Sequence, residues 1–171
     1  PPLFAPCTGN YLVSQEVSLT TATDGATIYY TTDGVEPDST KTVYSAPFNV
    51  STTTTVKAIA YKSGMNKSSV ASATYTFPTE VTNIAALRAG GAGFYKLTGE
   101  AVLTLHTTTR NTKYIQDATA AIVIDDASGV ITTPYTVGDG ITGIIGTTSV
   151  YNGSLQFVPV ANPAPATSTG N

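Results

Sequence analysis

Short segments rich in β-branched and aromatic residues recur along this sequence, and turn-forming pairs separate them. Asp24-Gly25, Asp33-Gly34 and Asn152-Gly153 are pairs that favour the tight turns of antiparallel hairpins. Between such turns, segments such as 15–20 and 54–62 alternate polar and apolar residues, which is typical of strands with one buried face. The sequence therefore predicts an all-β fold.

Charged residues are scarce, since Asp, Glu, Lys and Arg make up 11% of the chain, against roughly 25% in ordinary soluble domains. Thr and Ser replace them in runs such as 52–55 and 107–109, and Thr suits the half-exposed surface of a sheet. Because 41% of the residues are apolar, we expect folded domains rather than disorder. This profile is typical of a secreted or cell-surface β protein.

The length of 171 residues allows one large domain or two small ones, and Phe77–Glu80 interrupts the strand pattern. We expect a β-sandwich over residues 1–77, with strands at 15–20, 26–32, 47–51, 54–62 and 69–77. A second domain is expected over 78–162. Residues 163–171 have the composition of a linker or tail, beyond which we expect further domains. Since Cys7 is the only cysteine, no intrachain disulfide can form and each domain depends on its core.

The second domain begins with a long expected strand, 95–105, that places four apolar residues on one face: Leu97, Ala101, Leu103 and Leu105. Gly99 lies within this strand, and such a glycine often marks a sharp bend, as at the corner of a barrel. Further strands are expected at 113–117, 120–125, 141–147 and 154–160. Five strands with a bent first strand predict a small closed barrel. One short helix, started by Thr79 and ended by Gly90–Gly93, should precede it.

Three segments of the first domain form a recognisable set: Ala26–Gly34, which reads ATIYYTTDG, Thr53–Ala60, which reads TTTVKAIA, and the closing Ala73–Tyr75. Through these segments the first domain resembles the Ig-like domain at the C-terminus of chitobiases and β-hexosaminidases. The resemblance covers about 70 residues. It implies an accessory β-sandwich on secreted bacterial proteins, usually beside glycan-active domains, with no catalytic motif of its own.

In the second domain a further set of segments stands out, namely 95–101, 113–117, 121–126, 137–141 and 151–153, together with Gly146. Through these segments the second domain is similar to the OB-fold domains of secreted and surface proteins in Bacteroides-like bacteria. The resemblance implies a five-stranded OB-like barrel. Related domains occur beside extracellular nucleases, and others have no known ligand.

No catalytic constellation is visible in the sequence. Nucleophilic catalysis needs a nucleophile, a base and an orienting group in contact, but the only cysteine, Cys7, and the only histidine, His106, lie in different domains. A zinc site needs three or four ligands that this chain does not provide. We interpret Cys7 as a small packed residue and His106 as an exposed residue at a strand end. The sequence predicts no enzyme, no cofactor and no metal site.

Three aspartates of the second domain invite a catalytic or Ca²⁺-binding interpretation. Asp117, Asp125 and Asp126 are close in sequence, and a glycosidase uses a pair of carboxylates. Such a glycosidase also needs a sugar-binding cleft, and the chain has no Trp to line one. We therefore expect Asp117 to end a strand and Asp126–Gly129 to form a turn.

The OB resemblance also implies a binding face on the second and third strands of the barrel. The candidate binding residues there are Arg110, Lys113, Tyr114 and Gln116. A nucleic-acid base could stack on Tyr114 while Arg110 and Lys113 meet phosphates, although the nearby aspartates would oppose a phosphate. The alternative is that this face packs against the first domain.

A second binding hypothesis concerns the tyrosines of the first domain. A glycan platform could draw on Tyr11, Tyr29, Tyr30, Tyr44, Tyr61 and Tyr75. The alternative is that these tyrosines belong to the core and corners of the sandwich, since strand alternation buries about half of them.

The net charge of −3 and the singly scattered basic residues give no basic face for nucleic acid, and no apolar run is long enough to span a membrane. The interpretation we favour is a non-catalytic accessory or structural pair of domains in a larger bacterial surface or secreted protein. Its partners would be the flanking domains of the same chain or a glycan. A carbohydrate-binding accessory domain and a nucleic-acid-binding accessory of an extracellular nuclease remain as alternatives, and the oligomeric state is open.

Overall fold

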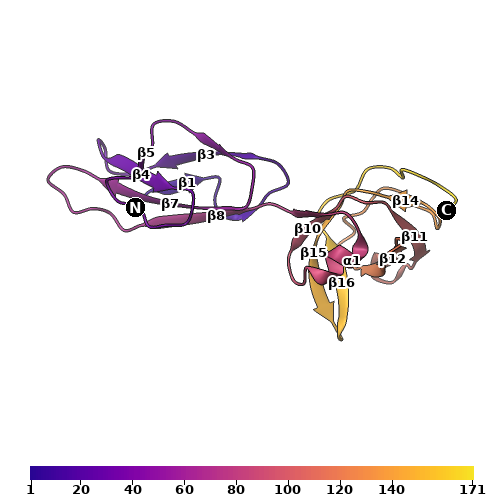
Figure 1. Cartoon of the computed structure of the whole chain (residues 1–171). Helices are drawn as coiled ribbons and strands as arrows, with labels where there is room; N and C mark the ends of the chain where they lie inside the picture. Colours follow the sequence, from indigo (N-terminus) through magenta and orange to yellow (C-terminus); the bar gives the residue numbers. More distant parts are fainter. The chain divides into compact units, whose positions relative to one another are not determined.

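The computed structural model describes residues 1–171, which form two compact units, Pro1–Phe77 and Pro78–Asn171 (Figure 1). Both units are built almost entirely of strands, with one α-helix and one 3-10 turn in the second unit. The predicted fold class, a β-sandwich followed by a β-barrel with one short helix, is confirmed. No helix of the structure is long and apolar enough to cross a membrane.

The first unit is a sandwich of two sheets (Figure 1). One sheet has the order β1-β3-β6 and contains β1 (Leu3–Ala5), β3 (Gln15–Thr20) and β6 (Phe48–Val50). The other has the order β2-β8-β7-β4-β5 and contains β2 (Gly9–Asn10), β8 (Ala71–Thr76), β7 (Thr54–Tyr61), β4 (Thr27–Thr31) and β5 (Thr42–Val43). The five strands expected from the sequence correspond to β3, β4, β6, β7 and β8.

The core of the sandwich follows from alternation along the strands. Val56, Ala58 and Ala60 of β7 point inward, as the alternation noted over residues 54–62 requires, and pack in one cluster with Val17 of β3. Tyr75 is fully buried in the same cluster, and its hydroxyl group donates a hydrogen bond of 2.8 Å to the carbonyl oxygen of Pro6. A buried tyrosine needs such a partner because an unpaired hydroxyl group in the core would be costly.

The second unit contains one curled sheet with the strand order β14-β11-β12-β13-β16-β15-β10-β9. Its strands are β9 (Thr79–Val81), β10 (Phe94–Leu97), β11 (Ala101–His106), β12 (Lys113–Gln116), β13 (Ala121–Ile124), β14 (Gly140–Ile141), β15 (Ile144–Tyr151) and β16 (Ser154–Pro159). β10 and β11 are consecutive in the chain but lie near opposite ends of this order. The bent segment that joins them therefore closes the sheet into a barrel.

The bend falls at the glycine that the sequence singled out. The expected strand 95–105 is divided into β10 and β11 by residues 98–100, with Gly99 at the centre. A Cβ atom at Gly99 would overlap the carbonyl oxygen of Thr82, so no other residue fits without a backbone shift. This close approach explains why the chain turns its corner at a glycine.

One core prediction for β11 is wrong. Leu103 pairs with Ile115, but the next pair in register is Leu105 with Tyr114, so one residue of β11 is bulged out of the ladder. A bulge reverses the alternation that follows it. Leu105 therefore points outward and is 49% exposed, whereas Leu97, Ala101 and Leu103 are buried as expected.

The helix begins at a later residue than predicted. α1 spans Ile84–Ala89 and is capped by Asn83, whose side chain accepts a hydrogen bond of 2.8 Å from the backbone N–H of Ala86. Thr79, the predicted start, belongs instead to β9, which pairs in parallel with β10. Ile84 and Leu87 are fully buried and attach the helix to the core of the second unit.

Residues 163–171, predicted as a linker or tail, are hydrogen-bonded to the second unit. Ser168 forms a β-bridge with Gly140 of β14. The backbone N–H of Thr167 donates to the carbonyl oxygen of Gly140 at 2.9 Å, and that of Asn171 donates to Gly138 at 3.0 Å. This segment covers the β14 edge, which would otherwise present unpaired backbone groups.

We predict that Gly99→Ala destabilises the second unit by about 1–3 kcal/mol or more, because the added methyl group meets backbone rather than a movable side chain. Hydrogen exchange of the full chain would show faster opening of β10, β11 and β15. Gly9→Ala in the first unit is the control, since its Cβ would lie 3.3 Å from the Tyr11 ring, which can move. Equal exchange rates in the two variants would contradict the prediction.

Candidate functional site

A groove of about 580 Å³ lies on the outer face of the second unit. This volume lies within the range of small-ligand sites, about 300–1,000 Å³. The groove, as we call it from here on, is lined by Arg88, Arg110, Thr112, Tyr114, Ala121, Ile122, Val123, Asp125, Tyr151, Asn152, Ser154, Leu155 and Gln156. These residues come from α1, from β12, β13, β15 and β16, and from the loops at their ends.

The floor of the groove is a row of side chains across three neighbouring strands. Tyr114 of β12 is paired with Val123 of β13, which is paired with Gln156 of β16. Strand alternation places all three on the outer face, while Ile115 and Ile124 point into the core. Tyr114 is 43% exposed, so its ring is available to a ligand.

One wall of the groove is the β11–β12 loop. Arg110 and Asn111 both have left-handed backbone conformations, with φ angles of 55° and 50°. The Arg110 guanidinium donates two hydrogen bonds to Asp125, of 3.0 Å from Nε to Oδ1 and 2.6 Å from Nη2 to Oδ2. Such a bidentate pair has a fixed orientation. Through the hydrogen bond and the opposite charge, it lowers the pKa of Asp125 and raises that of Arg110.

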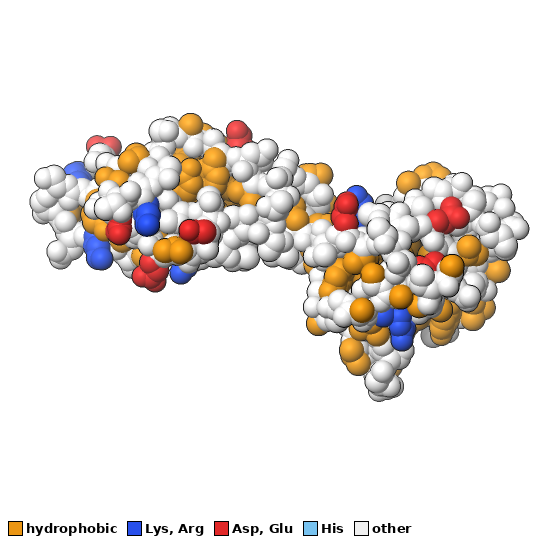
Figure 2. Space-filling model, viewed as in Figure 1, with side chains coloured by type: hydrophobic (Ala, Val, Ile, Leu, Met, Phe, Trp, Pro, Cys, Tyr) orange, Lys and Arg blue, Asp and Glu red, His pale blue; other side chains and the backbone are white.

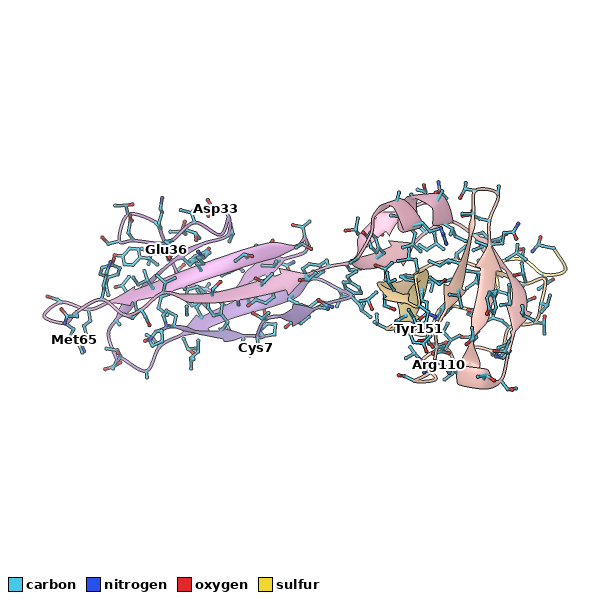
Figure 3. All side chains as sticks on the ribbon, turned by 90° about the horizontal axis from the view of Figure 1, so that it is seen from below. Cys7, Asp33, Glu36, Met65, Arg110 and Tyr151 are labelled. Atoms are coloured by element: carbon cyan, nitrogen blue, oxygen red, sulfur yellow. The ribbon has the colours of Figure 1, made fainter.

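The opposite wall is the turn of the β15–β16 hairpin. β15 pairs with β10 only as far as Thr147, whereas its pairing with β16 continues to Tyr151, so the tip of the hairpin projects beyond the rest of the sheet (Figure 1). Asn152 and Gly153 have φ angles of 49° and 78°, as the predicted hairpin turn requires. Tyr151 is 64% exposed at this tip, and Figure 3 shows it close to Arg110 in projection.

Lys113, a predicted binding residue, is not in the groove. Its side chain points inward, next to that of Ile115, and is 4% exposed. The Nζ atom lies 3.1 Å from Asp126 Oδ2 and donates a further hydrogen bond of 3.1 Å to the carbonyl oxygen of Asn111. Asp126 also accepts hydrogen bonds from the backbone N–H groups of Val130 and Ile131. The assignment of Lys113 to the binding face is therefore corrected, since Lys113 is part of a satisfied internal ion pair.

The other predicted site residues are divided between two places. Arg110 and Tyr114 line the groove, whereas Gln116 lies in a separate depression with Glu100, Val102, Thr104, Asp117, Ala118 and Asn171. Sequence analysis missed Arg88, Tyr151 and Gln156. Tyr151 directly precedes the Asn-Gly turn, which was a usable signal, but nothing in the sequence linked Arg88 to β13.

Each of the three aspartates considered for catalysis or Ca²⁺ has protein partners. Asp125 pairs with Arg110, and Asp126 with Lys113. Asp117 accepts from the backbone N–H groups of Ile84 at 2.6 Å, Thr119 at 2.7 Å and Ala120 at 3.0 Å. Although burial acts in the opposite direction, these hydrogen bonds and that of the Thr119 hydroxyl lower the pKa of Asp117. No group of three or more His, Cys, Asp or Glu side chains is arranged to hold a metal ion.

Cys7 and His106 are both exposed. His106 is exposed at the end of β11, as expected. Cys7 is exposed, so its interpretation as a packed residue is wrong. Cys7 follows Pro6 in the short connection between β1 and β2, where the chain lies outside both sheets.

The tyrosines of the first unit do not form a flat platform. Tyr75 is buried, Tyr30 stacks on Phe48 with ring centroids 4.6 Å apart, and Tyr44 contacts both rings edge-on. Tyr29 and Tyr61 lie on the outer face of the sheet, but their rings are perpendicular, with an interplanar angle of 88°. A sugar ring stacked on one of them would meet the edge of the other.

Comparison with known families gives a match in the first unit. The family model of the chitobiase/beta-hexosaminidase C-terminal domain matches residues 6–74, which confirms the resemblance proposed from the sequence. This family is a non-catalytic accessory domain of glycoside hydrolases. No curated protein and no solved structure matches the chain. The OB resemblance of the second unit stays a prediction.

We predict that Lys113→Met costs the second unit about 3–5 kcal/mol, because it leaves the Asp126 carboxylate buried without its cation. Lys96→Met is the matched control, since the side chains of the Lys96–Glu80 pair are 37% and 64% exposed and such pairs contribute about 1 kcal/mol or less. Hydrogen exchange of the slowest amides in β12 and β13 measures both effects. A similar loss of stability in the two variants would show that the buried Lys113–Asp126 pair stabilises the unit no more than the exposed Lys96–Glu80 pair.

Proposed function

We propose that this chain is a non-catalytic accessory segment of a larger secreted or cell-surface bacterial protein that acts on carbohydrate, and that its second unit binds a carbohydrate chain in the groove. The groove itself carries the proposal, because it joins two exposed tyrosines to a fixed Arg–Asp pair on one sheet face. It favours carbohydrate binding over a purely structural role for the pair of units.

The strand order of the second unit supports an OB-like barrel. Counting the bent β10–β11 segment as strand one, β12, β13, β15 and β16 follow as strands two to five. In OB barrels, oligosaccharides and oligonucleotides bind on strands two and three, between the loop that joins strands one and two and the loop that joins strands four and five. Here these elements are β12, β13, the β11–β12 loop and the β15–β16 turn, which enclose the groove.

The chemistry of the groove suits a sugar, which has both apolar C–H faces and hydroxyl groups. Tyr114 and Tyr151 offer aromatic surface to the C–H faces. Gln156, Asn152 and Thr112 offer amide and hydroxyl groups that both donate and accept hydrogen bonds. Because Asp125 already orients the Arg110 guanidinium, little side-chain entropy is lost when a ligand contacts this pair.

Single-stranded nucleic acid is the second candidate ligand, since two arginines and two tyrosines line the groove. The electrostatics favour carbohydrate instead. The second unit carries six acidic and four basic side chains, and Asp125 neutralises Arg110. Figure 2 shows how sparse charged side chains are on the visible face of both units. A nucleic acid would bring one negative charge per nucleotide to a surface that lacks the cations to meet it.

Native affinity electrophoresis of the full chain tests the proposal, with host mucin, plant polysaccharides, chitin oligomers or single-stranded DNA in separate gels. We expect retardation by at least one glycan and, in Tyr114→Ala and Tyr151→Ala, an affinity at least tenfold weaker, or about 1.4 kcal/mol. Tyr61→Ala in the first unit is the control and should bind as the unchanged protein does. DNA retardation that disappears with salt would favour the second candidate, and retardation by neither class would refute groove binding.

A further inference from the structure

We propose that the groove takes an acidic glycan, with the carboxylate of a uronic or sialic acid held by Arg88. This inference rests on the proposed function and names the class of carbohydrate. In the second unit, Arg88 is the only Lys or Arg side chain that has no carboxylate partner.

The basic side chains of the second unit are Arg88, Lys96, Arg110 and Lys113. Three of them form ion pairs, Lys96 with Glu80 at 2.9 Å, Arg110 with Asp125 at 2.6 Å, and Lys113 with Asp126 at 3.1 Å. Arg88 lies within ion-pair distance of no carboxylate. The groove therefore has one uncompensated positive charge, although the unit as a whole is acidic.

Arg88 is held at a defined place. It lies in the last turn of α1, which is attached to the barrel by the buried side chains of Ile84 and Leu87. Its Nη1 atom donates a hydrogen bond of 3.1 Å to the carbonyl oxygen of Ala121, the first residue of β13. This bond uses one of the guanidinium N–H groups, and the remaining groups can meet a ligand.

The two arginines mark the two ends of the groove. Arg88 contacts β13 at its first residue, Ala121, and Arg110 pairs with Asp125, which directly follows the last residue of the strand. Four residues of strand span about 13 Å. A glycan that lies along β13 would pass over the Tyr114–Val123–Gln156 row between the two ends.

A carboxylate matches Arg88 in geometry and in charge. A planar guanidinium binds a planar carboxylate through parallel hydrogen bonds, which are stronger than hydrogen bonds between neutral groups. At the far end Arg110 is already neutralised, so the groove offers one charged contact and otherwise neutral ones. This pattern fits a sugar chain with one carboxylate at the Arg88 end and disfavours a ligand with a charge on every unit of its backbone.

Titration calorimetry of the full chain with matched ligands tests the inference. One pair is a neutral oligosaccharide that ends in a single glucuronic acid and its methyl ester, and the other is sialylated and desialylated mucin oligosaccharide; single-stranded DNA is a separate arm. We expect one acidic ligand to bind at least tenfold more tightly than its uncharged counterpart, and added salt to weaken only the acidic one. We expect Arg88→Gln to abolish this preference, Arg88→Lys to keep part of it, and Lys96→Gln, outside the groove, to keep all of it.

The outcomes separate this inference from the proposed function. Equal binding of acidic and uncharged members of both pairs, or a preference that survives Arg88→Gln, would overturn the role of Arg88 and leave carbohydrate binding intact. Absence of binding to every glycan, acidic or neutral, would overturn both. Binding of DNA that is tighter than that of any glycan and depends on Arg88 would assign this cation to a phosphate instead.

Discussion

The groove depends on an ion pair that does not face it. Lys113 and Asp126 are buried in the second unit, where two charges are costly unless each is fully hydrogen-bonded. Lys113 meets this requirement through Asn111, which lies in the β11–β12 loop, and Asp126 through the backbone after β13. Asn111 follows Arg110 in the chain, and Asp126 follows Asp125. The internal pair therefore holds in place the two loop ends that carry the exposed Arg110–Asp125 pair.

Alternation along the strands determines most of what the sequence could predict. It located β3, β7 and β8 and the inward residues of β7, because a strand with one solvent-exposed face alternates regularly between polar and apolar residues. The same rule, applied to β12, would have placed Lys113 inside, next to Ile115. The prediction placed Lys113 on the exposed face because its side chain is charged. Asp126, the partner that makes burial of this charge tolerable, lies 13 residues away and cannot be identified from the local pattern.

The remaining differences arise where the backbone departs from regular pairing. The bulge after Leu103 turns Leu105 to the surface, and no residue type in β11 indicates that a bulge forms there. The helix begins at Ile84 rather than near Thr79 because β9 adds to the edge of the sheet, which is a contact distant in sequence. For the same reason, only part of the groove could be predicted from the sequence. Its floor follows from the strand pattern, but its walls depend on how far the β15–β16 hairpin projects and on where α1 docks.

The two units use their aromatic residues in different ways, and this difference supports the proposed binding at the groove. In the first unit the buried or mutually packed tyrosines stabilise a sandwich that matches the model of an accessory-domain family. In the second unit Tyr114 and Tyr151 are 43% and 64% exposed, and both line the groove. Exposed apolar side chains that gather in one place mark interaction sites. In the proposed complex, a sugar would cover the two aromatic rings and leave its hydroxyl groups to the solvent.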